Sequence, residues 1–328
     1  MDHAWRALYL SLALTTWLAS PFPAWAQLQG FQLNRYEPTA AGESSFAVDH
    51  PGYSAAYDLA AGLTLDYNHN SFVAGTVTRD AGAMSASAII AHQFVCHLEL
   101  AASFLDRVTA SLSLPVTLLE SGTAANGITP QSGAAGDPRI GAMVRLYGQP
   151  ESGRFSINFG GYLWIPLRAF SNLLPEQAGD QEVRGLLKLV LAGLIGHLRW
   201  SVTLGGLLRA DSVLGTPTFA DGSSTGTSLQ AGVLLQYVDK KRHFATGGEA
   251  FLDTVLTQGH AFQGEYTGLE VLLGGHYTAP GQVQLGLGAG IGFLSAPGTP
   301  DARLLLRVAY ALKDTFAPPK APTRVGGP

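Results

Sequence analysis

The stretch from Glu265 to Phe293 constrains the fold most, because its apolar residues recur at every second position. In its second half the apolar residues alternate with glutamine and glycine; they are Val283, Leu285, Leu287, Ala289, Ile291 and Phe293. The run from Thr267 to Tyr277 has the same period, and Pro280-Gly281 lies between the two runs. A period of two predicts strands with one apolar face, and the Pro-Gly turn joins them into a hairpin. Strands of about eleven residues at ~3.3 Å each, tilted by ~40°, match the apolar band of an outer membrane.

Composition narrows the class of protein. Charged residues make up 13% of the 328 residues, and 40 residues are glycine. This charged share is about half the usual one, which suits a β protein with much apolar outer surface better than a water-soluble enzyme. The formal net charge of −4 argues against nucleic acid as a partner. The single cysteine, Cys96, allows no internal disulfide.

Residues 1–26 are typical of a secretory signal peptide. Arg6 lies in a short polar start, an apolar run extends from Ala7 to Ala19, and Ala24-Trp25-Ala26 provides a small-x-small cleavage site. No later stretch reaches ~18 uninterrupted apolar residues, the length that a membrane helix needs. A closed barrel is then the remaining way to span a membrane, because every backbone amide must be paired inside lipid.

The rest of the chain repeats the hairpin pattern. Twelve strands are expected at about 54–67, 87–104, 107–119, 137–147, 154–166, 182–195, 198–211, 226–238, 243–255, 265–278, 282–293 and 301–312. Long connections, such as 68–86, alternate with short turns. This pattern predicts an all-β fold, a transmembrane antiparallel up-and-down β-barrel of about 12 strands, with long loops outside and both chain ends in the periplasm. The expected organisation is a signal peptide (1–26), a periplasmic or lumen-entering lead segment (27–52), the barrel (53–313) and a Pro/Gly-rich tail (314–328).

The outward face of the predicted strands carries no charge, as a lipid-facing surface requires. A charge there costs ~2–4 kcal/mol at mid-bilayer. Aromatic side chains on this face are expected near the short turns, where amphipathic rings prefer the headgroup boundary. The predicted girdle consists of Phe104, Phe155, Trp200, Tyr237, Phe244, Tyr277 and Tyr310.

Inward positions hold most of the charge in the strands, with bases and acids concentrated on different strands. The residues expected to line the lumen are Arg107, Arg139, Arg145, Arg154, Arg184, Lys188, Arg199, Arg209, Arg303, Arg307, Asp58, Glu99, Glu249, Asp253 and Glu270. Such an arrangement sets up a field across the lumen that a polar solute would feel. It predicts a porin-like channel for small polar solutes. The alternative is a structural or surface-interaction barrel whose charges pair and fill a closed interior.

Tyr162 and Trp164 point inward from the fifth predicted strand, where they either form a stacking surface for a passing solute or fill space. No metal ligand spacing, phosphate-binding glycine motif or Gly-x-Ser-x-Gly elbow is present. The sequence therefore predicts no catalytic residues, no metal and no cofactor, and the protein is expected not to be an enzyme.

Three phrases resemble the N-terminal barrel of a subgroup of OmpA-family outer-membrane proteins. They are Gln29 to Pro38, Arg107 to Val116, and Gly136 to Gly141. The resemblance implies a location in the outer membrane of a Gram-negative cell envelope, in contact with its lipid, but no defined substrate. Relatives often continue through acidic repeats into a peptidoglycan-binding domain. This chain shows neither, so peptidoglycan is not expected as a partner.

Overall fold

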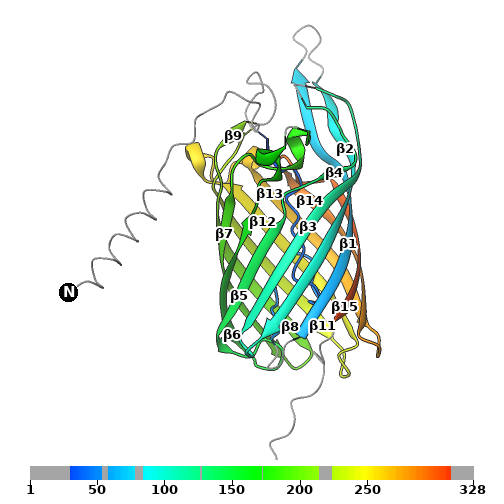
Figure 1. Cartoon of the computed structure of the whole chain (residues 1–328), viewed down its shortest axis with the longest axis vertical. Coiled ribbons are helices and arrows are strands. Elements are labelled where there is room, and N and C mark those ends of the chain that lie inside the picture. The colour runs from blue at the N-terminus through cyan, green and yellow to red at the C-terminus, as the bar shows by residue number, and fades with distance from the viewer. Residues whose placement is uncertain are drawn as a thin grey trace, which may run out of the picture.

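The computed structural model describes residues 30–53, 58–77, 84–125, 128–171, 173–213 and 224–311. The predicted signal peptide and the predicted tail lie outside these residues. In the described part, twelve long antiparallel strands form a closed barrel (Figure 1), which confirms the predicted fold class.

The barrel strands follow one another around the wall. Their bounds are β1 Asp58–Val77, β2 Met84–Phe104, β3 Val108–Ser121, β5 Arg139–Gly148, β6 Ser156–Trp164, β7 Arg184–Ile195, β8 Leu198–Leu208, β11 Ser228–Val238, β12 Phe244–Val255, β13 Thr267–Thr278, β14 Val283–Ser295 and β15 Ala302–Ala311. Pairing of β15 with β1 closes the ring, with Leu306 opposite Leu65. Closure leaves no unpaired sheet edge to face lipid.

Short elements lie in the long connections at one end of the barrel. They are β4 Ala134–Ala135, β9 Ser212–Val213, β10 Ser224–Thr225, and the 3-10 turns η1 Leu167–Phe170, η2 Glu176–Ala178, η3 Thr257–Gly259 and η4 Gly264–Tyr266. Among the described residues, no helix is both long and apolar enough to cross a bilayer. The opposite end has tight turns, such as the one at Leu105 and Asp106, whose φ angles of 57° and 52° are those of a type I′ hairpin.

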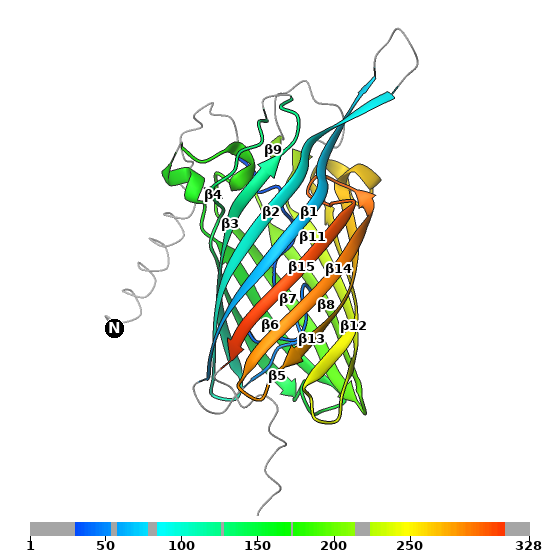
Figure 2. The same ribbon diagram turned by 90° about the vertical axis from the view of Figure 1, so that its right-hand side faces the viewer.

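The connection predicted at 68–86 as a long loop is largely strand. β1 continues to Val77 and β2 begins at Met84, so this hairpin rises above the rim of the barrel (Figure 2). Register shifts near His69 and Phe72 bend the pair. The prediction was wrong here because the bulge interrupts the alternation of inward and outward side chains along the strand. Beyond the bulge the alternation begins again in a different register.

Side chains alternate between the two faces of the wall. On β14, Leu287 is 68% exposed whereas Gln284 is only 2% exposed. The exposed positions on this and the other strands are mainly leucine, valine and aromatic residues, and the buried ones are mainly polar or glycine. The outer surface is therefore suited to lipid, and the sequence on the inner face is free to be polar.

Residues 30–53 run inside the barrel and are called the lead segment below; they appear as the dark blue trace in Figure 1. Gly30 lies among the long connections, where its carbonyl accepts a hydrogen bond from Ser212. Gly42 lies at the short-turn end, against Ala60 and Ala311. The lead segment therefore extends from the long-loop end of the lumen to the short-turn end, where β1 begins and β15 ends.

Candidate functional site

Apolar residues of the lead segment anchor it at two heights of the lumen. Near the long loops, Phe31 and Leu33 pack in a buried cluster with Phe72, Ile89 and Ile128. Nearer the short turns, a second cluster is formed by Tyr36, Phe46, Leu272 and Leu305. Burial of a large apolar side chain contributes ~1.5–3 kcal/mol, so these anchors hold the segment in one place. Buried charged residues such as Asp66 and Arg303 also contact the segment.

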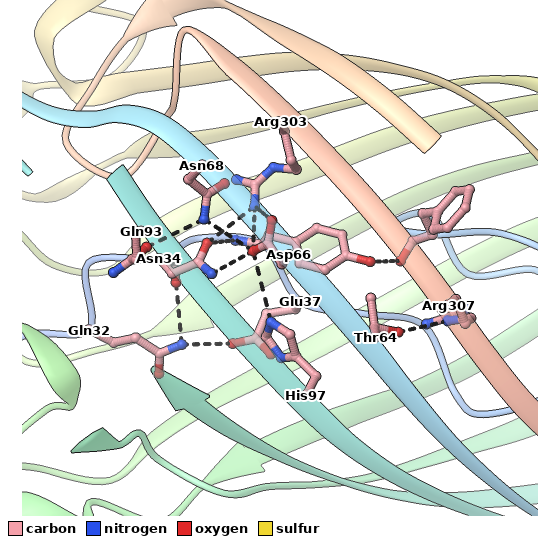
Figure 3. Close-up of polar contacts among 12 residues, drawn as sticks. Gln32, Asn34, Glu37, Thr64, Asp66, Asn68, Gln93, His97, Arg303 and Arg307 are labelled. Atoms are coloured by element: carbon pink, nitrogen blue, oxygen red, sulfur yellow. Dashed lines mark hydrogen bonds and ion pairs between the residues drawn. The ribbon is translucent and has the colours of Figure 1, made fainter. Parts of the chain in front are cut away.

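A buried ionic network joins the lead segment to strands β1 and β15 (Figure 3), and Glu270 extends it to β13. Arg303 lies between two carboxylates, donating to Asp66 at 2.7 Å and to Glu270 at 2.8 Å. Asn34 of the lead segment donates to the same Asp66 carboxylate at 2.8 Å. Because buried charges need partners and hydrogen bonds, this network fixes the position of the lead segment against the wall.

Arg307 makes the second buried ion pair, with Glu99 at 3.2 Å. Its guanidinium also donates to the side chain and carbonyl of Thr39 and to the carbonyl of Ser45, both in the lead segment. Glu249 binds the lead segment in a different way, since its carboxylate accepts three successive backbone N–H groups, beginning with that of Phe46 at 2.6 Å. Both residues satisfy backbone groups that would otherwise be unpaired inside the barrel.

Cations and aromatic rings line one wall, on the neighbouring strands β5, β6 and β7. The Arg139 guanidinium lies 4.5 Å from the Tyr162 ring centroid, and that of Arg184 lies 4.6 Å from the Trp164 ring centroid. Lys188 lies 5.2 Å from the Tyr162 ring centroid. These distances are in the range of cation–π attraction. In this structure the two rings therefore contact cations, and their faces are not free to stack on a solute. We call Arg139, Tyr162, Trp164, Arg184 and Lys188 the basic wall.

Two carboxylates of the lead segment bind to the basic wall. Glu37 accepts a hydrogen bond from Trp164 Nε1 at 2.8 Å and pairs with Arg139 and Arg184, each at 3.4 Å. Asp49 accepts from the Tyr162 hydroxyl at 2.8 Å and from Lys188 Nζ at 2.7 Å.

On the opposite side of the lumen the wall supplies the acid and the lead segment supplies the base. Asp253 on β12 is an acid, and here the lead segment supplies a base, Arg35, whose guanidinium lies 2.7 Å from the Asp253 carboxylate. The lead segment thus presents acids to the basic wall and a base to the acidic side, which neutralises the field across the lumen.

Both ends of the lumen have ion pairs of their own. At the short-turn end Arg145 pairs with Asp106, and Arg199 pairs with Glu151 at 3.1 Å. Burial raises the pKa of the Glu151 carboxyl, but Arg199 and His50 outweigh it and hold this pKa well below its usual value. At the long-loop end Arg209 contacts Asp180.

Asp137 connects the long loops to the barrel, just before β5 begins. Its carboxylate accepts the backbone N–H of Leu167 at 3.1 Å and that of Asp180 at 2.8 Å. Burial raises the pKa of this carboxyl to about 6, although Arg184 nearby acts in the opposite direction. The protonation state of Asp137 is therefore coupled to the order of the connection that contains η1 and η2.

Most residues predicted to line the lumen are buried within the barrel, and three are not. The buried ones are Arg139, Arg145, Arg184, Arg199, Arg303, Arg307, Glu99, Glu249 and Glu270, with Lys188, Arg209 and Asp253 partly buried beside them. Arg107 and Arg154 lie instead in exposed turns, because β3 and β6 begin later than predicted. Asp58 is half-exposed at the first position of β1. Charged side chains at the rim remain in contact with water, so they do not need partners inside the barrel.

The predicted girdle residues lie at the short-turn ends of the strands with their rings outward. Tyr237, Phe244, Tyr277 and Tyr310 are between 44% and 51% exposed. Phe155 stacks on Trp200 with ring centroids 6.2 Å apart, and Phe104 is the last residue of β2. A band of rings at one height suits the headgroup boundary.

In the part of the chain that the structure describes, two small cavities lie beside the lead segment. One of about 70 Å³ is bordered by Asp49, Arg139 and Lys188, and one of about 30 Å³ is bordered by Arg184 and Arg209. Both are also lined by five shared residues, Arg35, Glu37, Trp164, Gln230 and Asp253. They lie between the lead segment and the wall, in contact with both charged sides.

The sequence-based prediction missed the charged residues of the lead segment. Arg35, Glu37 and Asp49 lie in a stretch without period, and no pattern shows that this stretch folds inside the barrel. A signal was present on β14, where Gly286, Gly288, Gly290 and Gly292 leave the inner face without side chains. An inner face built from glycine indicates that another part of the protein occupies the space.

Comparison with known proteins supports the β-barrel fold but does not assign the chain to a protein family. No family model matches the chain, and a search of curated proteins finds no match either. The structure is similar to that of an outer membrane channel from Pseudomonas putida F1, with a TM-score of 0.58, 15% sequence identity and coverage of 80% of this chain and 98% of that chain. The NanC porin gives a TM-score of 0.45 at 9% identity, covering 78% of this chain and 98% of that one. The chain thus has the fold of outer-membrane β-barrels.

Proposed function

We propose that the protein is an outer-membrane channel for small polar solutes, in which the lead segment narrows the passage. The observation that carries this proposal is the pair of cavities between the lead segment and the wall, which share five lining residues and touch both charged sides. A polar solute moving along this line would exchange water for fixed charges at each step, as in other selective pores.

The volumes of the two cavities limit which solutes fit inside the barrel while the lead segment is in the described position. A cavity needs ~10–15 Å³ to hold one water, so volumes of about 70 and 30 Å³ hold a few waters but no sugar or amino acid. Passage of a larger solute therefore requires the lead segment to shift. Its polar contacts can be exchanged for water, whereas the barrel wall is held by continuous ladders of backbone hydrogen bonds.

Single-channel recording in planar bilayers tests the proposal. The wild-type chain is expected to show small, fluctuating conductance, and a chain lacking residues 30–50 is expected to show a larger and steadier one. Heat-modifiable gel mobility reports in parallel that each barrel is folded. If folded barrels of both chains give no conductance above leak, the channel proposal is wrong.

A structural or surface-interaction barrel is the second candidate. It is favoured by the completeness of the interior pairing around Arg303 and Arg307, both of which are 0% exposed. Such an interior needs no solute to satisfy it. In this case deletion of the lead segment would lower the stability of the barrel without producing conductance.

The proposal includes location in the outer membrane of a Gram-negative cell, a non-enzymatic role and a relationship to the N-terminal barrels of the OmpA family. Two of the family-like phrases have structural roles here that support it: Asn34 and Arg35 bind the wall, and Asp137 holds the long-loop connection. Fractionation of cell envelopes tests the location, with recovery in the inner-membrane or soluble fraction as the contrary result. Co-sedimentation with peptidoglycan is expected to be absent.

A further inference from the structure

We propose that the basic wall is a binding site for small carboxylates, and that Glu37 and Asp49 occupy it as internal substitutes for the solute. The proposal rests on the proposed channel function and names the class of solute, organic acids with one or two carboxylate groups. It follows from the way in which the wall binds the two lead-segment side chains.

The two carboxylates are held by the same combination of donors. Glu37 receives an indole N–H from Trp164 at 2.8 Å, and Asp49 receives the Tyr162 hydroxyl hydrogen at 2.8 Å. Each also has a cation, since Arg139 and Arg184 lie at 3.4 Å from Glu37, and Lys188 at 2.7 Å from Asp49. One aromatic donor and at least one cation form a complete receptor for a carboxylate, because charge-assisted hydrogen bonds are the strong ones.

The donors belong to the rigid wall, not to the lead segment. Arg139 pairs in register with Trp164, which in turn pairs with Arg184, so the three lie side by side on β5, β6 and β7. The rings lie against the cations at 4.5 and 4.6 Å, which fixes the direction of the guanidinium groups. A site held by paired strands persists when the lead segment moves.

The wall also retains donor capacity that the lead segment does not use. Within the described structure, Nε of Arg139 is buried without a hydrogen-bond partner, whereas Nε of Arg184 lies 3.5 Å from the Asp180 carboxylate. The cavity of about 70 Å³ is lined by Glu37, Asp49 and four members of the basic wall, Arg139, Tyr162, Trp164 and Lys188, whereas Arg184 lines the cavity of about 30 Å³. A buried donor without an acceptor is unfavourable, and an entering carboxylate oxygen could accept a hydrogen bond from it.

Charge reversal by the lead segment identifies it as an internal competitor. It places acids on the basic wall but a base, Arg35, on the acidic side at Asp253. A free carboxylate must therefore displace the carboxylate of Glu37 or Asp49 from its donors on the basic wall. Because a tethered group competes at an effective concentration of the order of mM, the wild-type chain should bind free carboxylates weakly.

Isothermal titration of acetate into folded, detergent-solubilised barrels tests this inference without requiring conductance. The variant Glu37→Ala/Asp49→Ala removes both competitors and leaves space for acetate. We expect it to bind acetate at least about tenfold more tightly than the wild-type chain, with the cation choline showing no change. The single variants Glu37→Ala and Asp49→Ala should each show part of the gain, which keeps the test valid if the double variant does not fold.

The matched control is Glu182→Ala/Glu265→Ala, which removes two acids from exposed positions outside the lumen and changes the net charge equally. If the control gains as much affinity as the lead-segment variant, or if neither gains, the carboxylate site is refuted. Adding Lys188→Gln and Arg139→Gln to the lead-segment variant should abolish the gain, and an unchanged affinity would also refute the site. The channel proposal is judged separately, by the bilayer recordings.

Discussion

The ring of Phe46 in the lead segment occupies the place where Gly288 of β14 has no side chain. A Cβ atom at Gly288 would lie 2.9 Å from Phe46 Cε2, and one at Gly286 would lie 3.2 Å from Phe46 Cζ. Gly286 and Gly288 on the inner face of β14 therefore leave the space that Phe46 of the lead segment occupies. They do not widen an open pore.

This relationship predicts the effect of adding one methyl group. Gly288→Ala should destabilise the folded barrel by ~1–3 kcal/mol, because overpacking forces the Phe46 ring or the backbone to move. Thermal unfolding followed by gel mobility measures the change. The matched control is Gly206→Ala on β8, where a Cβ meets no atom within 4 Å. Equal effects of the two substitutions would contradict the assignment of Phe46 to this space.

Charge on the outer face of the same strand should impair membrane assembly. Leu287 is 68% exposed on the apolar surface, so Leu287→Arg is expected to cost ~2–4 kcal/mol. The measurement is the folded fraction after insertion into lipid vesicles. Gln263→Arg, in an exposed loop, is the control and should assemble normally. Normal assembly of Leu287→Arg would show that this face does not contact lipid.

Gln284 should not tolerate substitution by a charged residue, although its inward position in the alternation alone suggests that it would. Its side chain is 2% exposed and donates to Ser44 Oγ of the lead segment at 3.1 Å. An arginine there would displace the turn of the lead segment near Gly42. We expect Gln284→Arg to fold as a barrel in which the lead segment is cleaved faster by protease than in the wild-type chain; unchanged cleavage would contradict this contact.

Removal of Arg303 should be strongly destabilising. Arg303→Met leaves Asp66 and Glu270 as buried carboxylates without their shared cation, for which we expect a loss of ~3–5 kcal/mol in unfolding free energy. Neutralising both partners, in Arg303→Met/Asp66→Asn/Glu270→Gln, should recover most of it. Denaturant titration measures both values. A triple variant no more stable than the single one would mean that packing of the arginine, not its charge, is what matters.

The order of the long-loop connection should depend on pH through Asp137. Its folded-state pKa of about 6 lies above the ordinary aspartate value of 3.8, so the folded state binds the proton more tightly than the unfolded state. The resulting stabilisation is present below pH ~3.8 and is lost as the pH rises through ~6, with a total of up to ~3 kcal/mol. Protease cleavage in the connection containing η1 and η2 should therefore be faster at pH 7 than at pH 4.5, after correction for protease activity. Asp137→Asn, which does not titrate, should remove this difference.

Much of the wall could be predicted because its signal is local. The period of two from Val283 to Phe293 assigns Leu287 to lipid, and its repetition predicts each of the twelve strands. The main boundary error, at 68–86, arises from a bulge that interrupts the period. The position of Arg107 and Arg154 depends on where the strands end, which the alternation does not define.

The interior could be predicted only in part. The alternation places Arg139, Arg184 and Lys188 on the inner face, but it does not identify their partners. Those partners, Glu37 and Asp49, are about a hundred or more residues away along the chain and lie in a segment with no regular structure. No local rule connects them.

The amino-acid sequence by itself determined the cylinder: which residues face lipid, which face inward, and how many strands close the ring. Tertiary structure alone decided what fills that cylinder, because the lead segment is placed by contacts such as Phe46 on Gly288 and Asp49 on Lys188. The physical reason is that a strand face is set by the geometry of successive residues, whereas the match of an irregular segment to a cavity depends on shape and charge brought together only when the barrel has closed.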